Sequence, residues 1–431
     1  MQTAYRPIRV ALLGAGSVGS QVARLLLENK DELARRVGAE LELSGIAVRN
    51  IGAKRDADLP KELFTEDAES LIIASDIVIE LIGGIEPAKS WITLALNSGA
   101  DVITANKALI AAHGSELLGL AQQLGAQLYY EAAVGGAIPI IRPLRESLAG
   151  DKINRVMGIV NGTTNYILDQ MESTGADFAD ALKEAQDLGY AEADPTADVE
   201  AFDAASKAAI LASLAFHSEV PVAEVYREGI TSVSAMQIET ARQAGYSVKL
   251  LAICERVDNG ESGLVVRVHP TLIPLDHPLA AVRGAYNAVF VEAESAGRLM
   301  FYGAGAGGPE TASAVLGDLV SAAKRHLAGG PGLSDSTHAN LKVLPVQRVR
   351  TRFQITLEVK DQPGVLASIA NEFASHGVSV ETVAQTAAND AALLTIMTHI
   401  ANEGDLEKLV ESLSSNDSVD KVDSVIRVEG I

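Results

Sequence analysis

The run IRVALL at residues 8–13, followed by GAGSVG at 14–19 and an amphipathic stretch at 20–29, decides the fold of the first part of the chain. The apolar run predicts a buried strand, and the amphipathic stretch predicts a helix. In such a unit the first glycine permits a tight turn, the second lets the backbone approach a pyrophosphate, and the third lets the helix pack on the strand. The N–H groups at the helix N-terminus can then bind the anion. We therefore predict a dinucleotide site, rather than a plain glycine-rich turn, formed by Gly14, Ala15, Gly16, Ser17, Val18 and Gly19.

Strand-like and helix-like segments alternate after this turn. The strands are expected at residues 41–48, 76–81, 101–104 and 127–130, and helices between them include 88–97 and 115–124. This alternation predicts an α/β fold with a Rossmann-type doubly wound parallel sheet. Ligands of such sheets bind at the carboxyl ends of the strands. Thr104 and Lys107, in the segment TANK at one of these ends, are candidates for cofactor contact, although Lys107 could also be an exposed lysine at a helix start.

The end of the second strand bears on the choice of cofactor. Sites for NAD usually carry Asp or Glu there to bind the ribose hydroxyls. This chain has Arg49 and Asn50 instead, with Lys54 close behind. A cation suits the 2′-phosphate of NADP, so NADP is favoured or at least accepted alongside NAD, whereas a solvated loop arginine fits the spacing equally well.

Composition limits the classes of protein that the chain can belong to. Its 431 residues suggest about three domains, and 48% apolar residues are enough to form cores. The balance of 35 Lys+Arg against 56 Asp+Glu gives a net charge of −21, which argues against a nucleic-acid partner. The single cysteine, Cys254, excludes a disulfide framework and is expected in a core. The N-terminus lacks a signal-peptide pattern and no long uncharged apolar stretch occurs, so we expect a cytoplasmic protein without a membrane partner.

The middle of the chain contains an unusual charged pair. Residues 201–216 are apolar nearly all round, which predicts a buried helix. Asp203 and Lys207 are four residues apart and share one face of it. Because burying charges is costly, the pair is a functional candidate, and a structural ion pair at a helix surface is the alternative. Upstream, a polar turn at 161–165 opens a helix at 166–172, with Thr163 or Thr164 as a candidate cap.

Two further groups of segments complete the middle region. Strands are expected at residues 247–254, 262–268 and 287–293, as a sheet beside the nucleotide domain, which makes the middle region an α+β domain. A second glycine-rich loop at 301–309 precedes a helix at 310–326. Its glycines permit close approach of the backbone to a ligand, so a cofactor contact is plausible there.

Taken together, the motifs GAGSVG, TANK, EAAVGGAIP, GIVNGTTNYIL, GYAEADPTADVEAFDAASK and FYGAGAGGPET occur in the order found in homoserine dehydrogenases. The resemblance covers about residues 8–326. It implies reversible, NAD(P)-dependent interconversion of L-aspartate 4-semialdehyde and L-homoserine, a step toward threonine, methionine and isoleucine. We know of no motif in the chain that conflicts with it.

The resemblance also implies roles for individual residues. Lys207 would be the proton donor to the aldehyde oxygen, and Asp203 would hold Lys207 and contact the substrate. Glu192 would bind the substrate ammonium, and Thr163, Tyr190 and Asp198 would line the pocket. The cofactor would be met by the glycine turn and by Arg49, Thr104, Lys107, Gly189, Glu192 and Gly303. A monovalent cation such as sodium would be bound by the carboxylate of Glu131 and by backbone groups of Val134, Gly136 and Ile138, since carbonyls and one carboxylate suit a hard cation.

The C-terminal part predicts a separate regulatory domain. After a small-residue linker at 329–351, strands and helices are expected at 353–360, 365–375, 379–385, 391–399, 405–414 and 419–428. This βαββαβ order is ferredoxin-like and resembles an ACT domain, whose DxPG turn matches Asp361–Gly364. The resemblance implies an amino-acid effector, L-threonine, near Asp361, Gly364, Val365 and Leu366. A dimerising module without a ligand is the alternative.

These predictions define four segments, and the sequence argues against three other functions. The segments are a dinucleotide-binding domain at 1–139, a catalytic and dimerisation domain at 140–328, the linker at 329–351 and the ACT domain at 352–431, in a homodimer or homotetramer. A semialdehyde or phosphorylating dehydrogenase would need a nucleophilic cysteine, which Cys254 does not provide. A hydroxyacid dehydrogenase with an ACT tail would need a catalytic histidine motif that is not found. A non-catalytic nucleotide and amino-acid sensor would not need Asp203, Lys207 and Glu192.

Overall fold

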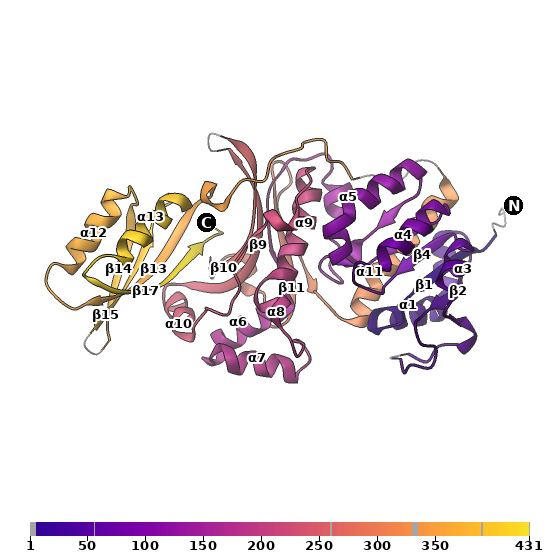
Figure 1. The fold of residues 1–431 in the computed structure, drawn as a ribbon, viewed down its shortest axis with the longest axis horizontal. Helices are drawn as coiled ribbons and strands as arrows, with labels where there is room; N and C mark the ends of the chain where they lie inside the picture. Colours follow the sequence, from indigo (N-terminus) through magenta and orange to yellow (C-terminus); the bar gives the residue numbers. More distant parts are fainter. Residues whose placement is uncertain (1–5, 56, 259–260, 330–334, 389–390, 431) are drawn as a thin grey trace. The chain divides into compact units, whose positions relative to one another are not determined.

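The computed structural model describes residues 6–55, 57–258, 261–329, 335–388 and 391–430 (Figure 1). The chain forms two compact units. The first comprises residues 1–156, 209–222 and 286–340, and the second comprises residues 157–208, 223–285 and 341–431. Among the described residues, no helix combines the length and the apolar character that crossing a bilayer requires.

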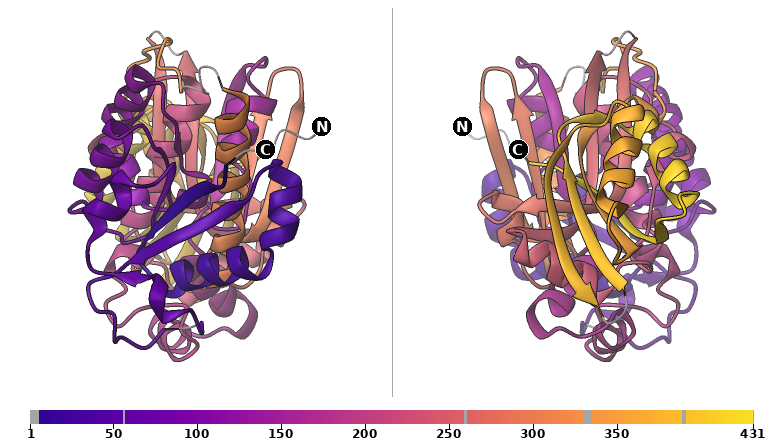
Figure 2. Two further views of the ribbon diagram at one scale, coloured as in Figure 1. Left: turned by 90° about the vertical axis from the view of Figure 1, so that its right-hand side faces the viewer. Right: turned by 90° about the vertical axis from the view of Figure 1, so that its left-hand side faces the viewer.

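The first unit contains the predicted parallel sheet. Its strands follow the order β3-β2-β1-β4-β5-β6, and every neighbouring pair is parallel. The strands are β1 (Ile8–Leu13), β2 (Leu41–Ala47), β3 (Phe64–Thr65), β4 (Ile77–Glu80), β5 (Asp101–Thr104) and β6 (Leu128–Tyr129). Val10, Leu12, Ile46, Ile77 and Ile79 are fully buried in the core of this sheet. The doubly wound architecture is therefore confirmed, and the left view of Figure 2 shows its indigo and purple strands and helices.

Helices connect these strands and cover the sheet. They are α1 (Ser17–Glu28), α2 (Lys30–Val37), α3 (Ala68–Ile73), α4 (Ala88–Asn97), α5 (Lys107–Leu124) and the much later α11 (Gly308–Ala328). α11 packs beside α1, and its Val315 and Leu319 join the core of the sheet. The predicted start of α5 at residue 115 is wrong, because Asn106 caps the helix by accepting a hydrogen bond from the N–H of Leu109 at 3.1 Å.

A hairpin belongs to the same unit. β11 (Tyr286–Ala293) and β12 (Gly297–Ala304) pair antiparallel along eight residues each. The glycine-rich loop predicted at 301–309 therefore begins later, because residues 301–304 are the end of β12. The following helix begins at Gly308 instead of residue 310, with Pro309 in its first turn, where proline needs no N–H partner.

The second unit contains a long sheet. β9 (Tyr246–Asp258) and β10 (Ser262–Pro274) pair antiparallel over 13 residues each. The order continues as β9-β10-β17-β13-β15-β14, with β13 (Arg350–Lys360), β14 (Val380–Ala388), β15 (Ala391–Thr398) and β17 (Val419–Val428). Cys254 is fully buried in β9, as predicted. The short strands β8 (Tyr226–Arg227) and β16 (Ala401–Asn402) pair with β10 and β13.

The C-terminal part has the predicted βαββαβ order of an ACT domain. Its helices are α12 (Val365–Ser375) and α13 (Glu403–Ser414), which lie side by side on one face of its strands in the right view of Figure 2. The last strand, β17, also pairs parallel with β10, where Thr271 faces Arg427 and Leu272 faces Val428. Residues 330–334 of the predicted linker lie outside the described residues. Near the end of the linker, the N–H of Leu344 donates to the carbonyl of Leu264 on β10 at 2.7 Å, and the N–H of Leu264 donates to the carbonyl of Lys342 at 2.8 Å.

The helices that carry the charged pair and its surroundings complete the second unit. They are α6 (Gly162–Thr174), α7 (Phe178–Asp187), α8 (Thr196–Val199), α10 (Ala235–Gln243) and the first half of α9 (Phe202–Phe216). β7 (Ile153–Ile159) leads directly into α6. Most of α9 is buried, which confirms the prediction from its composition.

Candidate active site and cofactor site

The glycine turn after β1 has the steric properties expected of a dinucleotide site. Gly14 has φ of +97°, and a Cβ there would lie 2.7 Å from the carbonyl oxygen of Leu81. A Cβ on Gly19 would lie 2.2 Å from the carbonyl oxygen of Gly14, whereas one on Gly16 would meet no atom within 4 Å. The first and third glycines are therefore required by packing, and the space at the second is open to a ligand.

The N-terminus of α1 is suited to an anion. Gly16 occupies the N-cap, with no side-chain cap, and the first turn contains no acidic residue. Ser17 is exposed, and the hydroxyl of Ser20 donates to the carbonyl of Ala15 at 3.0 Å, which fixes the turn. The N–H groups and the positive end of the helix dipole are thus available to a pyrophosphate.

A buried carboxylate, which the sequence did not reveal, organises the neighbouring strand ends. Glu80 at the end of β4 accepts hydrogen bonds from the N–H groups of Ile82 (2.7 Å) and Gly83 (3.2 Å). It also accepts the hydroxyl of Thr104 at 2.6 Å. In the sequence, Glu80 was marked only by being an acid at the end of an apolar run. Its hydrogen bond with Thr104 gives Thr104 a role in shaping the loop after β4.

Asn106 and Lys107 follow Thr104 at the same edge. Asn106 donates from its backbone N–H to Thr104 Oγ1 (3.0 Å) and from its side chain to the carbonyl of Gly84 (2.6 Å). Lys107 is the exposed first residue of α5. The segment TANK thus ties together two loops at the carboxyl ends of β4 and β5, where ligands of such sheets bind.

Arg49 is exposed two residues after the end of β2, and Lys54 is exposed as well. No carboxylate occupies the end of this strand, which is Ala47 followed by Val48. The edge therefore presents positive charge where a ribose-binding acid would stand in a typical NAD site.

The second glycine-rich segment reaches the nucleotide turn. A Cβ on Gly308 would lie 3.1 Å from the carbonyl oxygen of Ser17. A Cβ on Gly303 would lie 3.2 Å from the side chain of Ile138, and the N–H of Ala137 donates to the carbonyl of Ala304 at 3.0 Å. The segment thus lies between the glycine turn and the loop predicted to bind a cation.

That loop contains buried carbonyl groups but no accessible carboxylate. The Glu131 carboxylate accepts three backbone N–H groups, from Ile140 (2.6 Å), Ile141 (2.8 Å) and Arg142 (3.0 Å). Val134, Gly136 and Ile138 are buried, and no hydrogen bond between described residues ends on their carbonyl oxygens. Within the described ranges, no cluster of three His, Cys, Asp or Glu side chains could hold a metal. The donors available to a cation are therefore carbonyl oxygens.

A buried acid on α11 supports this loop. Asp318 accepts the N–H of Glu131 at 2.9 Å and pairs with Arg142 at 2.8 Å. Burial nevertheless raises the pKa of Asp318 to about 6. Since the fold disfavours the ionised acid, this group lowers stability as the pH rises from about 4 to about 6.

The charged pair on α9 is buried and closely paired. Asp203 and Lys207 are each only 8% exposed, and Lys207 Nζ lies 2.8 Å from Asp203 Oδ2. The ammonium also donates to the carbonyl oxygen of Val160 at 2.6 Å. The pair is therefore not a surface ion pair. An ammonium carries three N–H groups, so one can donate to a substrate oxygen.

Asn161 connects this pair to a second acid. Its amide nitrogen donates to Asp198 Oδ1 (2.7 Å) and to Asp203 Oδ2 (2.9 Å). Its amide oxygen accepts the N–H of Thr164 at 2.9 Å, so Asn161 caps α6 and the prediction of a threonine cap is wrong. The signal was present, because asparagine is among the best N-cap residues.

The loop before α8 lies beside this cluster. The hydroxyl of Thr163 donates to the carbonyl of Tyr190 at 2.6 Å, and the Tyr190 ring lies 4.9 Å from that of Tyr166. Gly189 has φ of +78°, and Tyr190 and Glu192 have exposed side chains. The structure thus brings Asp198, Asp203 and Lys207 together around Asn161 and ties Thr163 to Tyr190.

The predicted effector residues form an exposed turn. Gly364, with φ of +97°, is the N-cap of α12 and provides no side-chain cap. Asp361 is exposed and accepts Gln385 Nε2 at 3.4 Å, Val365 is half-buried, and Leu366 is 51% exposed. The turn offers both an acid and an apolar side chain next to open backbone N–H groups.

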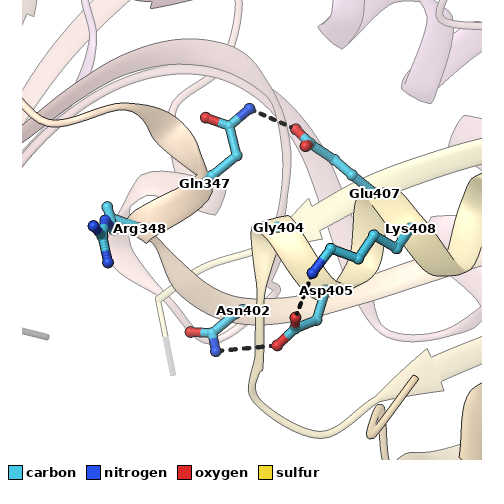
Figure 3. A pocket seen from close by; sticks show the side chains of 7 residues that line it. All are labelled: Gln347, Arg348, Asn402, Gly404, Asp405, Glu407 and Lys408. Atoms are coloured by element: carbon cyan, nitrogen blue, oxygen red, sulfur yellow. Dashed lines mark hydrogen bonds and ion pairs between the residues drawn. The ribbon is translucent and has the colours of Figure 1, made fainter. Parts of the chain in front are cut away.

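A separate polar pocket lies at the start of α13 (Figure 3). Its polar side chains bond to one another: Gln347 to Glu407 (2.9 Å), Asn402 to Asp405 (3.3 Å) and Lys408 to Asp405 (3.6 Å). None of the predicted effector residues lines it.

An open glycine turn on a parallel sheet and a buried lysine–carboxylate cluster together define the class of nicotinamide-dependent dehydrogenases, and this chain has a C-terminal ACT domain as well. Comparisons with known sequences give the particular family. The models described as "Homoserine dehydrogenase", "Homoserine dehydrogenase, NAD binding domain" and "ACT domain" match residues 139–320, 14–131 and 353–417. The chain belongs to the homoserine dehydrogenase family and is an oxidoreductase.

Similar proteins agree over nearly the whole length. The homoserine dehydrogenase of Corynebacterium glutamicum is 55% identical over 98% of this chain and 96% of its own. The homoserine dehydrogenase of Mycobacterium tuberculosis is 52% identical over 99% of this chain and 98% of its own. A solved homoserine dehydrogenase from Thiobacillus denitrificans superposes with a TM-score of 0.92, at 39% identity and 99% coverage of both chains. A hyperthermophilic archaeal homoserine dehydrogenase in complex with NADPH has a TM-score of 0.62 at 30% identity, over 75% of this chain and 99% of that one.

Proposed function

We propose that this chain reduces L-aspartate 4-semialdehyde reversibly to L-homoserine, with Lys207 giving its proton to the carbonyl oxygen. One observation carries the assignment: a buried ammonium is held by Asp203 (2.8 Å) and by the carbonyl of Val160 (2.6 Å), which aims its remaining N–H away from both. A buried charged pair of this kind is more readily explained by chemistry than by stability.

The residues act on the charge that develops during reduction. When bound, the nicotinamide cofactor supplies the hydride. The carbonyl oxygen then gains negative charge, which Lys207 stabilises and neutralises by donating a proton. Asp203 keeps Lys207 in place and contacts the substrate. The carboxylate of Glu192 binds the substrate ammonium, and Thr163, Tyr190 and Asp198 line the pocket.

NADP is the proposed cofactor, with NAD as a second substrate of the same site. The exposed Arg49 and Lys54 after β2 support a 2′-phosphate, and a relative in the same family has been solved with NADPH. The glycine turn, Thr104, Lys107, Gly189, Glu192 and Gly303 complete the proposed contacts.

A direct assay tests this function. Homoserine is added to the protein with NADP or with NAD, and the absorbance of the reduced nicotinamide is followed. We expect turnover with both and a higher kcat/KM with NADP. Absence of turnover with either cofactor would rule out the proposed reaction, and a higher kcat/KM with NAD would rule out the proposed preference.

A monovalent cation such as sodium is the proposed ligand of the loop at residues 131–138. The support comes from the carbonyl groups of Val134, Gly136 and Ile138, because buried carbonyls usually have partners. The Glu131 carboxylate shapes the loop through the N–H groups of residues 140–142, and its backbone carbonyl is the expected donor at that position.

Removing the cation should therefore destabilise the protein. In sodium chloride, the free energy of unfolding by urea is expected to exceed that in choline chloride of equal ionic strength by about 1–3 kcal/mol. Choline is too large for a loop carbonyl site, so it serves as the control. Equal stability in the two salts would contradict the cation site.

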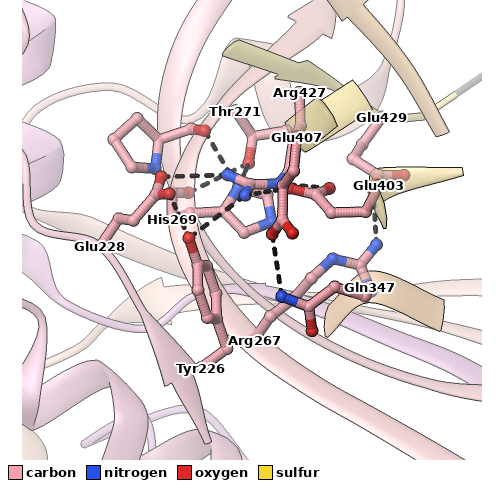
Figure 4. Close-up of polar contacts among 11 residues, drawn as sticks. Tyr226, Glu228, Arg267, His269, Thr271, Gln347, Glu403, Glu407, Arg427 and Glu429 are labelled. Atoms are coloured by element: carbon pink, nitrogen blue, oxygen red, sulfur yellow. Dashed lines mark hydrogen bonds and ion pairs between the residues drawn. The ribbon is translucent and has the colours of Figure 1, made fainter. Parts of the chain in front are cut away.

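L-Threonine is the proposed effector, acting through the ACT domain. Contacts within the second unit link that domain to the catalytic sheet, as Figure 4 shows. The buried Arg267 on β10 pairs with Glu429 at 2.6 Å, and Arg427 on β17 pairs with Glu403 and with Glu228 at 3.0 Å. Displacement of β17 would disturb these pairs, which gives the ACT domain a physical route to the catalytic part.

The Leu366→Asp variant should uncouple the enzyme from its effector. A charge at the apolar part of the turn is expected to raise the half-inhibiting threonine concentration at least tenfold, which corresponds to a loss of about 1.4 kcal/mol in binding free energy. The kcat without threonine should stay unchanged. Ile400→Asp is the matched control, since Ile400 is an exposed (61%) apolar residue of the same domain outside the turn. Inhibition lost equally in both variants would contradict an effector site at this turn.

Three coarser features complete the proposal. The domain boundaries proposed are 1–139, 140–328, 329–351 and 352–431, which the ranges matched by the three family models support. The assembly proposed is a homodimer or homotetramer. The location proposed is the cytoplasm, where a biosynthetic step of this kind draws on the nicotinamide pool.

A further inference from the structure

We propose that Asn161 is a positioning residue of this reaction: its amide holds the carboxylates of Asp198 and Asp203 together, and through Asp203 it sets the direction of the Lys207 ammonium. The inference rests on the proposed function and adds a residue that acts through the catalytic pair. Asn161 lies between β7 and α6, and its side chain contacts Asp198, Asp203 and Thr164.

The orientation of the Asn161 amide is determined by its four contacts. The amide nitrogen donates both of its hydrogens, to Asp198 Oδ1 at 2.7 Å and to Asp203 Oδ2 at 2.9 Å. The amide oxygen accepts the N–H and the hydroxyl of Thr164, at 2.9 and 3.0 Å. A flipped amide would place oxygen against two acids, so only one orientation satisfies the network. Asn161 is buried, which makes each of these bonds costly to lose.

The Asn161 amide and the Lys207 ammonium meet on one carboxylate oxygen. Asp203 Oδ2 receives hydrogen bonds from both the ammonium of Lys207 (2.8 Å) and the amide of Asn161 (2.9 Å). The same amide nitrogen donates to Asp198 Oδ1, so one side chain fixes the positions of both acids. The direction of the Lys207 ammonium therefore depends on where Asn161 holds Asp203.

The same corner of the chain also holds Lys207 through the backbone. The carbonyl oxygen of Val160 accepts a hydrogen bond from the Lys207 ammonium at 2.6 Å, and Val160 directly precedes Asn161. Two adjacent residues therefore orient the ammonium, one by its carbonyl and the other by its side chain through Asp203. A small shift of this corner would move the proton donor away from the substrate oxygen, and a misplacement of about 1 Å can cost about 10²-fold in rate.

The Asn161→Asp variant tests this role. Aspartate keeps the size of the side chain and caps helices equally well, so α6 keeps its start. At pH 8 the introduced carboxylate cannot donate and faces Asp198 on α8 and both Asp203 and Lys207 on α9. We expect kcat/KM for homoserine to fall about 10²-fold with an unchanged cofactor Kd. Protonation restores one O–H donor, so the ratio of wild-type to variant kcat/KM should shrink toward pH 6.

Asn165→Asp is the matched control. Asn165 lies one turn further along α6, is equally buried, and donates to the carbonyls of Val282 (3.3 Å) and Gly284 (2.9 Å) instead of to acids. The same substitution there should lower the melting temperature without a pH-dependent loss of kcat/KM. If Asn161→Asp does not fold, Asn161→Ser, which retains an N-cap hydroxyl, is expected to show a similar fall in kcat/KM at every pH.

The outcomes separate this inference from the proposed function. If the wild-type enzyme oxidises homoserine and Asn161→Asp has a pH profile parallel to it, or if Asn165→Asp reproduces the pH-dependent loss, Asn161 has no positioning role. If Asn161→Ser is used in its place, a kcat/KM equal to that of the wild-type enzyme would also show that Asn161 has no positioning role. If the wild-type enzyme does not turn over homoserine, the proposed function itself fails.

Discussion

The Lys207→Ala variant is expected to bind the cofactor normally but to lose about 10²- to 10⁴-fold in kcat, the usual contribution of a positioned proton donor. Lys207 is buried and is held by Asp203 and by the carbonyl of Val160, at 2.8 and 2.6 Å. Its removal takes away the group that stabilises the developing oxyanion, while the glycine turn is untouched. The loss should appear in kcat, measured in both directions of the reaction, with cofactor Kd from fluorescence titration unchanged.

A second buried lysine provides the control for general effects of removing such a group. Lys249 on β9 is fully buried and donates to the carbonyl of Val282 at 2.7 Å, and burial lowers its pKa to about 8. Lys249→Ala should lower the free energy of unfolding, while kcat of the folded protein stays close to the wild-type value. Comparable losses of kcat in the two variants, or near-normal turnover by Lys207→Ala, would contradict the assignment of Lys207.

The Gly16→Val variant should fold normally and lose cofactor binding. A Cβ at this position meets nothing within 4 Å, so we expect the added side chain to extend into the space that the pyrophosphate requires. Preventing one or two charge-assisted hydrogen bonds of about 1.5–3 kcal/mol each should raise the Kd for NADP about 10²-fold. The Kd is measured by titration, and the folded state is checked by the melting temperature.

Gly19→Ala separates packing from ligand binding at the same turn. Its Cβ would lie 2.2 Å from the carbonyl oxygen of Gly14, so the helix must move and stability should fall by about 1–3 kcal/mol. We expect a lower melting temperature for Gly19→Ala and an unchanged one for Gly16→Val. Normal NADP affinity in Gly16→Val would show that the pyrophosphate binds elsewhere.

Patterns local in sequence predicted most of the fold. Strand β1, the turn at Gly14–Gly19 and helix α1 are short-range features, so periodicity and glycine spacing were sufficient. The same holds for the βαββαβ order of the ACT domain. The pair Asp203 and Lys207 stood out because two charges in an apolar helix are rarely retained without a reason.

Features that depend on contacts between distant segments could not be predicted. The packing of α11 beside α1 and the parallel pairing of β17 with β10 join residues far apart in the chain. The role of Asn161 depends on Asp198 and Asp203, which follow it by 37 and 42 residues. The Glu131 carboxylate is bound by backbone N–H groups of residues 140–142, which no side-chain pattern reveals.

A crystal structure of the protein with homoserine and the oxidised cofactor would test the role of Lys207 most directly. We predict that Lys207 Nζ lies within about 2.6–3.2 Å of the substrate hydroxyl oxygen while it keeps its contacts with Asp203 and Val160. A hydroxyl oxygen bound by another group, with Lys207 still directed only at those two partners, would contradict the mechanism.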